Sequence, residues 1–284
     1  MTIDPSGRSP LVGAFLCTVL LGLGGAVASC GGNVNHGAAS DAGSDVSTLD
    51  GASADSAPLS FIAFDDVPSG GDFIATFLPP STLPGNCPPP PIAHGACTVY
   101  PPCSLPSPDA GLADAGWAHY TNAGTLTITG TTSAVMSVTP GSDGTYEAMT
   151  SGPLFLPGAK LGVAASGADF PGFPEQTVRA PMGIALVSPR LPYTISTSAD
   201  LAVAWTGGEL GAQVILAFEA GAGLINCWFD AAAGQGTVPA VALDGLSGNG
   251  SILFGQHFST EFAAGGHRVQ LTALNDTTAP ATFQ

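Results

Sequence analysis

The chain has 284 residues, a formal net charge of −16 and only 9% charged residues, whereas 45% of its residues are hydrophobic. Five lysines and arginines stand against 21 aspartates and glutamates. Such a surface repels phosphate backbones and anionic head groups, so we exclude nucleic-acid binding. With 39 glycines and 25 prolines, the chain offers little material for long amphipathic helices, and its composition favours a β protein with many turns.

An apolar run from Leu11 to Ser29 ends in Val27-Ala28-Ser29-Cys30. This ending resembles the lipobox of bacterial lipoproteins. The resemblance implies a signal peptide over residues 1–29, cleavage before Cys30, and attachment of palmitate or related acyl chains to Cys30. Gly31 takes the place of the aspartate that retains lipoproteins at the inner membrane, which implies lipid anchoring at the cell outer membrane. The alternative is a transmembrane helix, against which stand the glycines between Gly13 and Gly25 and the lack of a basic flank.

Residues 30–57 consist mainly of glycine, alanine, serine and aspartate, with almost no large apolar side chain. Such a segment cannot bury enough surface to offset its conformational entropy. We therefore expect a disordered acidic tether, with a root-mean-square reach of roughly 30 Å.

Residues 58–284 are long enough for one antiparallel β-sandwich domain with a substantial core. We divide it into a proline- and cysteine-rich part, residues 58–115, and a main sandwich, residues 116–284. The first part begins with predicted strands over 59–64 and 73–78. Between them, Asp65 and Asp66 are predicted to lie in a turn, where aspartate more often bonds the backbone than binds calcium. The stretch 79–108 holds 11 prolines, which predicts an irregular excursion stapled to the sheet by disulfides.

Apolar–polar alternation predicts a strand over 124–130. A strand over 134–138 follows, and later candidates lie over 161–165, 184–187, 201–205, 214–219, 224–229, 252–258 and 268–273, with the spacing of a sandwich or barrel. The turn at Ser142-Asp143-Gly144 precedes another strand at Tyr146. One short helix is predicted over 240–246, with Thr237 as its cap and Pro239 at its opening.

Four cysteines remain after Cys17 leaves with the signal and Cys30 takes lipid: Cys87, Cys97, Cys103 and Cys227. In an exported domain they predict two disulfides, with three connectivities open. A zinc site is the competing interpretation, but the spacing lacks a Cys-x2-Cys pair, so we predict no metal.

The stretches ADLAVAWTGG, QVILAFEA and LINCWFDAAAGQGTVPAVALDGL fall between Ala199 and Leu246. In this order they resemble uncharacterised outer-membrane lipoproteins of myxobacterial type, and the resemblance extends to GACTVYPPC and NAGTLTITG. It implies a shared fold in a family without an assigned activity, and it transfers no catalytic residue.

The sequence contains none of the spaced motifs of metalloproteases, α/β-hydrolases or phosphate-binding loops, so its catalytic residues are unknown and no cofactor is expected. Sandwich modules often present aromatic platforms to sugars, and Trp117, Tyr120 and Tyr146 are the candidate ligand-binding residues. We therefore expect a role in binding, adhesion or envelope structure, with a glycan or protein partner at the cell surface. The alternative is a secreted glycan-acting hydrolase or a carbohydrate-binding module.

Overall fold

The structure is a computed structural model that describes residues 59–68, 70–78, 92–100, 120–133, 135–221 and 223–284. These residues form three β-sheets, a single turn of 3-10 helix at Ala231–Ala233 and the short helix α2 (Ala240–Leu243). The all-β prediction is thereby confirmed for the described residues, and so is the predicted short helix after Pro239.

The largest sheet has ten strands: β1 (Leu59–Val67), β2 (Gly70–Thr76), β3 (Ile92–His94), β4 (Cys97–Tyr100), β7 (Tyr146–Thr150), β11 (Tyr193–Ile195), β13 (Gln213–Ala220), β14 (Gly223–Asp230), β16 (Gly248–Ala264) and β17 (His267–Phe283). A four-stranded sheet contains β5 (Leu126–Thr129), β6 (Val135–Val138), β8 (Lys160–Ala165) and β9 (Phe173–Arg179). A three-stranded sheet contains β10 (Ala185–Ser188), β12 (Leu201–Thr206) and β15 (Gln235–Val238).

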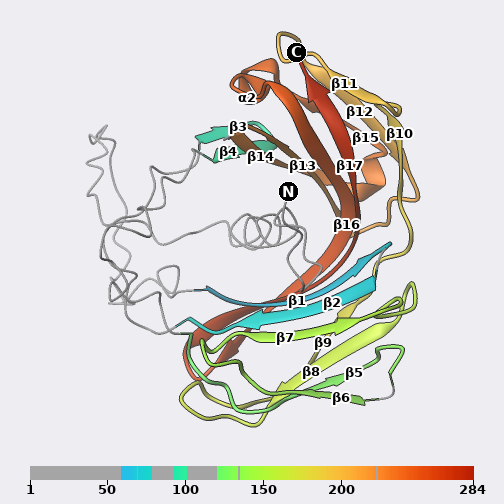
Figure 1. Cartoon of the computed structure of the whole chain (residues 1–284). Helices are drawn as coiled ribbons and strands as arrows, with labels where there is room; N and C mark the ends of the chain where they lie inside the picture. Colours follow the sequence, from blue (N-terminus) through green and yellow to red (C-terminus); the bar gives the residue numbers. More distant parts are fainter. Residues whose placement is uncertain (1–58, 69, 79–91, 101–119, 134, 222) are drawn as a thin grey trace, which may run out of the picture.

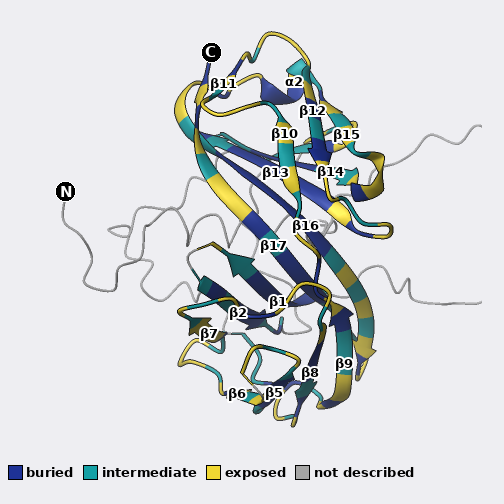
Figure 2. Ribbon diagram, turned by 90° about the vertical axis from the view of Figure 1, so that its right-hand side faces the viewer, coloured by how far each residue is buried: buried dark blue, intermediate teal, exposed yellow. Residues whose placement is uncertain are grey.

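Two long antiparallel strands, β16 and β17, form the backbone of the molecule. Each has 17 residues, so each spans about 55 Å at the usual rise of an antiparallel strand. They pair along their whole length, from Gly248 opposite Phe283 to Ala264 opposite His267. Figure 2 shows both strands running from one end of the molecule to the other. The pairs β1–β17 and β11–β17 are parallel, whereas the other pairs are antiparallel.

The two small sheets pack on the same outer side of the large sheet, at its opposite ends, and produce two lobes (Figure 1). In lobe 1 the four-stranded sheet packs on β1, β2, β7 and the paired ends of β16 and β17 near residues 258–273. In lobe 2 the three-stranded sheet and α2 pack on β4, β13, β14 and the other ends of β16 and β17. Each lobe has its own hydrophobic core.

The lobe 1 core is aromatic. Phe64 and Phe73, which are cross-strand partners, meet edge-on with ring centroids 5.2 Å apart. The rings of Phe77, which follows β2, and Phe170, in the loop between β8 and β9, have centroids 4.6 Å apart. Such tilted and edge-on pairs add about 0.5–1.5 kcal/mol beyond the area that they bury.

The segment that the sequence assigns to a turn at Asp65 and Asp66 belongs instead to strands. β1 continues through Val67 and β2 already begins at Gly70, so the turn is confined to the residues between them. Asp65 pairs with Asp72 across the hairpin. The charged residues were misleading because strand pairing with β17 and β2 outweighs the turn preference of aspartate.

Other predicted boundaries change as well. α2 ends at Leu243 and its N-cap is Pro239, because Thr237 belongs to β15. The side chain of Asp200 supplies the capping contact, since its Oδ1 accepts a hydrogen bond from the Ala240 N–H at 2.8 Å. The predicted strands at 252–258 and 268–273 extend to the full β16 and β17. Strands β3, β4, β9, β11 and β15 were not expected.

The chain order interleaves the lobes. β1 and β2 belong to lobe 1, β3 and β4 to the far edge of the sheet in lobe 2, and β5 to β9 again to lobe 1. The division expected near residue 115 falls outside the described residues.

Candidate functional site at the waist between the lobes

The waist is the stretch of β16 and β17 between the two cores, and it has two distinct faces. Neighbouring residues of a strand point to opposite faces, and laterally paired residues share one. Asp66, Gln256 and Asn275 therefore point to the outer side, between the small sheets. Asp65, His257 and Asp276 point to the opposite side, which we call the concave face.

At Gly255, in the waist, the two strands approach too closely for a side chain. A Cβ on Gly255 would lie 2.5 Å from the Cβ of Asp276 and 2.6 Å from the carbonyl oxygen of Asn275. Contacts this short do not occur between real atoms. Glycine at this position therefore permits the close approach of β16 and β17.

A pocket of about 310 Å³ opens on the outer side of the waist. One wall comes from lobe 1, through Asp66, Gly70 and Ser151–Pro153, and the other from Ile184 and Phe254 of lobe 2. Asn275, Asp276 and Thr277 form its floor. Ligand pockets start at about this volume and combine apolar walls with a few polar groups, so the site fits a small polar ligand.

The carboxylate of Asp66 is fixed at the edge of this pocket. Its Oδ1 accepts a hydrogen bond from the Leu154 N–H at 2.7 Å. Burial raises the pKa of Asp66, and the hydrogen bond from Leu154 opposes that shift.

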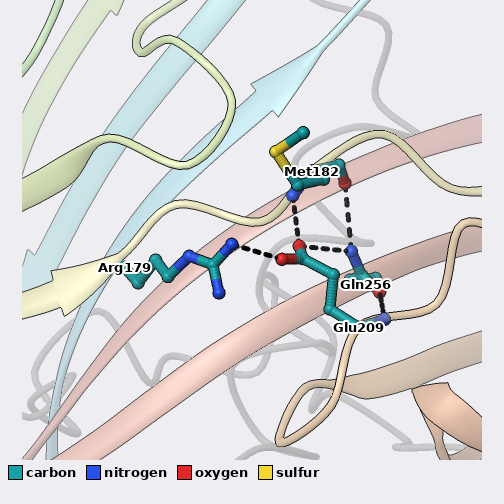
Figure 3. Close-up of polar contacts among 4 residues, drawn as sticks. All are labelled: Arg179, Met182, Glu209 and Gln256. Carbon is teal, nitrogen blue, oxygen red and sulfur yellow. Dashed lines mark hydrogen bonds and ion pairs between the residues drawn. The ribbon is translucent and has the colours of Figure 1, made fainter.

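Beside the pocket, four residues clamp the lobes together (Figure 3). The amide nitrogen of Gln256, on β16, donates to the Met182 carbonyl at 3.0 Å and to Glu209 Oε2 at 3.1 Å, and its Oε1 accepts from the Glu209 N–H at 3.1 Å. Arg179, at the end of β9, binds Glu209 Oε1 at 2.6 Å. Gln256 is fully buried, so these bonds tie the loops after β9 and β12 to the central strand.

The concave face carries a second polar group of residues around Leu274. Asp65 lies on β1 opposite Leu274, His257 lies on β16 opposite Leu274, and Thr272 and Asp276 lie two residues to either side along β17. Each of the four is at most 6% exposed. The ring of His257 meets that of Trp228 edge-on, with centroids 5.2 Å apart.

Burial shifts the acid–base equilibria of this group toward the neutral forms. It raises the pKa of Asp276 to about 7 and lowers that of His257 to about 4. Burial also raises the pKa of Asp65, and the charges of Asp276, Asp72 and Asp66 raise it further. Carboxyl groups with raised pKa values can donate protons or hydrogen bonds near neutral pH.

Strand register turns these carboxyl groups to different faces of the sheet. Asp66 points to the outer side, whereas Asp65 and Asp276 point to the concave side, although Asp276 also lines part of the pocket. Glycoside hydrolysis needs both carboxyls on one cleft that holds the sugar. The pocket therefore suits binding better than hydrolysis. Among the described residues, no three His, Cys, Asp or Glu side chains are grouped to hold a metal ion.

The structure places some of the residues that the sequence singles out. Cys97 and Cys227 form a disulfide that joins β4 to β14, as expected for cysteines that staple the proline-rich part to the sheet. Cys30, Cys87, Cys103 and Trp117 lie outside the described residues.

The candidate platform residues Tyr120 and Tyr146 are not both at the surface. Tyr120 is half-buried, and Tyr146 is fully buried in the lobe 1 core. The Tyr146 hydroxyl accepts from the Ala123 N–H and donates to the Gly124 carbonyl, both at 2.8 Å. In this position the Tyr146 ring is not available for stacking on a sugar.

Sequence reasoning did not single out Gln256, Glu209 or Asp276. Gln256 stands in the run LFGQHF, next to His257 and between apolar residues. A polar residue at such a position on a strand indicates a buried polar contact. Glu209 lies in a loop, and Asp276 in a polar stretch, so neither has a local signal that distinguishes it.

Among the described residues, no helix has the length and hydrophobicity needed to cross a membrane. No family model matches the chain, and no curated protein matches it.

Two solved structures show weak similarity. One is a tetra-tandem repeat in the extending region of a large adhesion protein, with 14% identity and a TM-score of 0.20 over 77% of this chain and 49% of that one. Another comes from work on host cell surface retention of a 1.5-MDa bacterial ice-binding adhesin, with 11% identity and a TM-score of 0.21 over 81% of this chain and 66% of that one. The chain thus spans about half of the first structure and less than two thirds of the second. At TM-scores this low, the similarity to adhesin domains transfers no function.

Proposed function

We propose that this chain is a lipid-anchored protein of the outer membrane, which holds a two-lobed β module on an acidic tether and uses it for binding or adhesion. The single observation that carries the anchor is the sequence Val27-Ala28-Ser29-Cys30 at the end of an apolar run. We also propose that this chain is related to the uncharacterised myxobacterial-type lipoproteins that its sequence resembles.

One feature of the described residues supports an exported location. The Cys97–Cys227 disulfide joins neighbouring strands and is fully buried, and disulfides of this structural kind persist mainly in exported proteins.

The waist pocket supports the binding role. Its walls come from both lobes, and its polar groups are a carboxylate, an amide and hydroxyls, with Phe254 as an aromatic wall. Such a set recognises hydroxyl groups through hydrogen bonds and a sugar face through the ring, so a saccharide unit is the ligand that it suits best.

The anchor is tested by replacing Cys30→Ser and following acylation with labelled palmitate in the expressing bacterium. The matched control is Cys17→Ser, which removes the other cysteine of the same apolar run. We expect the Cys30 variant to lose label and remain unprocessed, and the Cys17 variant to behave as wild type. Label and membrane association retained without Cys30 would contradict the anchor.

The pocket is tested by thermal shift of the purified chain against a panel of saccharides, using Gly152→Trp to fill the pocket and Gly152→Ala as its control. No atom lies within 4 Å of a Cβ at Gly152, so both variants should fold. A ligand at a hundred times its dissociation constant stabilises the folded chain by about 2.7 kcal/mol. The shift should be lost in the tryptophan variant alone; a shift retained there places binding elsewhere.

A further inference from the structure

The waist pocket holds a carboxylate that no described cation balances. Asp66 supplies this carboxylate, because strand register turns the side chain of Asp276 to the concave side although that residue contributes to the floor. Among the described residues that line the pocket, none is a lysine, an arginine or a histidine. Asp66 Oδ1 accepts from the Leu154 N–H, whereas Asp66 Oδ2 receives no hydrogen bond from a described residue. One oxygen of a fixed carboxylate is therefore free to accept from a ligand.

Three neutral polar groups of the pocket are free in the same way. Asn275 is the strand partner of Asp66, so the two side chains lie next to each other on the outer side of the sheet. The side chains of Asn275, Thr277 and Ser151 make no hydrogen bond to another described residue. Gln256, on the other side of Asn275, differs, because both ends of its amide are bound in the clamp. The pocket thus offers a ligand one charged acceptor and three neutral groups that can bind hydroxyls.

The cation of the clamp, Arg179, does not compensate the charge of Asp66. Its guanidinium binds Glu209 Oε1 at 2.6 Å, and Arg179 is not among the residues that line the pocket. The whole chain has a formal net charge of −16, so its long-range field also attracts cations and repels anions. Both the local and the overall charge therefore favour a ligand with a positive group.

We propose that the waist pocket selects saccharides that carry a free ammonium group over neutral and anionic ones. The inference rests on the proposed saccharide-binding function and names the ligand class of the same site. The ammonium group donates a charge-assisted hydrogen bond to Asp66 Oδ2, and the sugar hydroxyls bind the free side chains beside it. A neutral sugar leaves the charge of Asp66 uncompensated, and a carboxylated sugar adds a second negative charge next to it.

The expected preference is moderate, because Asp66 is only half-buried and water screens its charge. Ion pairs at exposed positions strengthen an interaction up to about fivefold, and those with a partly buried carboxylate do so by more. We therefore expect glucosamine to bind at least about fivefold more tightly than glucose, and glucuronate to bind more weakly than glucose. Added salt should reduce these differences, since it screens charges near the surface.

The test measures the affinity of the purified chain for glucosamine, glucose and glucuronate, which are positive, neutral and negative near neutral pH. Affinities come from thermal shift titrations, in which each variant is compared with its own ligand-free melting temperature. Asp66→Asn keeps an oxygen for the Leu154 N–H and removes the charge. Asp143→Asn is the matched control, because it removes the same charge from an exposed side chain that also accepts a backbone N–H and lies outside the pocket. We expect the order glucosamine, glucose, glucuronate in wild type and in Asp143→Asn, and equal affinities for glucosamine and glucose in Asp66→Asn.

Gly152→Trp, which fills the pocket, gives the baseline for effects outside it. Equal affinities of wild type for glucosamine and glucose, both lost in Gly152→Trp, overturn the inference and leave the saccharide-binding function intact. A preference for glucosamine that persists in Asp66→Asn or in Gly152→Trp overturns the inference as well, and so does an equal shift with ammonium chloride. The order in wild type is informative by itself, so the test does not depend on the folding of Asp66→Asn. If no saccharide shifts the melting temperature, the proposed function and the inference fail together.

Discussion

The Cys97–Cys227 disulfide is expected to contribute more to stability than any other single contact in the molecule. It closes a loop with a sequence separation of 130 residues, which includes all of the four-stranded and most of the three-stranded sheet. Chain entropy alone gives about 5 kcal/mol for a loop of this length at 25 °C, because the crosslink removes extended conformations from the unfolded state.

The variant to compare with wild type is the double replacement Cys97→Ala and Cys227→Ala, which leaves no unpaired thiol at the site. Measured losses for native disulfides are about 2–5 kcal/mol, so we expect a decrease in the free energy of unfolding within that range. For a domain of this size this corresponds to a melting temperature lower by about 4–20 °C. Both cysteines are fully buried, and part of the loss will come from the small cavity that the missing sulfur atoms leave.

The assay is urea unfolding followed by tryptophan fluorescence, to which Trp205 contributes from the lobe 2 core, where its ring N–H donates to the Ala231 carbonyl at 2.7 Å. Val99→Ala, on the same strand as Cys97, measures the cost of a small cavity without loss of a crosslink. A loss in the double variant no larger than that of Val99→Ala would refute the loop argument. Peptide mapping without reduction should find Cys97 joined to Cys227, and Cys87 joined to Cys103, the pair left by elimination.

Three further predictions concern the waist. Burial raises the pKa of folded Asp276 to about 7, so the free energy of unfolding is highest at low pH and falls as pH rises from about 4 to 7 and this carboxyl ionises. In urea unfolding, Asp276→Asn should therefore stabilise the chain by up to about 4 kcal/mol at pH 8 and by little at pH 4. The exposed Asp143→Asn should show no such gain. Gln256→Ala leaves the Glu209 N–H and the Met182 carbonyl without their partner and should cost about 2–3 kcal/mol in the same assay, against less than about 0.5 kcal/mol for Gln176→Ala, a half-buried glutamine whose side chain bonds only the nearby Pro174 carbonyl. Gly255→Ala should lower the melting temperature by several degrees through its clash with Asp276, whereas Gly152→Ala, which meets no atom within 4 Å, should leave it unchanged.

Some strands of the small sheets could be predicted because they alternate between a buried and an exposed face, whereas β9 and β15 could not. β5 shows this pattern most clearly, with Leu126 and Ile128 buried and Thr127 exposed. β13 could be predicted for a different reason: its centre is buried on both faces, so it reads as a continuous apolar run.

The full lengths of β16 and β17 were missed because polar residues follow their apolar centres. Beyond Phe258 the alternation continues, with Ser259 and Glu261 exposed and Phe262 and Ala264 turned toward the lobe 1 core. Gly265-Gly266, at the end of this pattern, is a two-residue hairpin signal that would have joined the two strands in register. The parallel pairing of β1 with β17 has no such local signal, because it depends on contacts more than 200 residues apart in the chain.

The waist depends on the same long-range pairing, which explains why its residues could not be assembled from sequence. Asp66, Gln256 and Asn275 come from three strands that meet only after β1 has docked on β17 and β16 has paired with it. Because β16 and β17 run unbroken through both cores, the lobes cannot rotate about the waist without breaking paired strands. The clamp around Gln256 opposes separation of the loops on the outer side, and the pocket walls are therefore held at a fixed spacing. A binding module on a flexible tether gains from such rigidity, since a preformed site loses less entropy when its ligand binds.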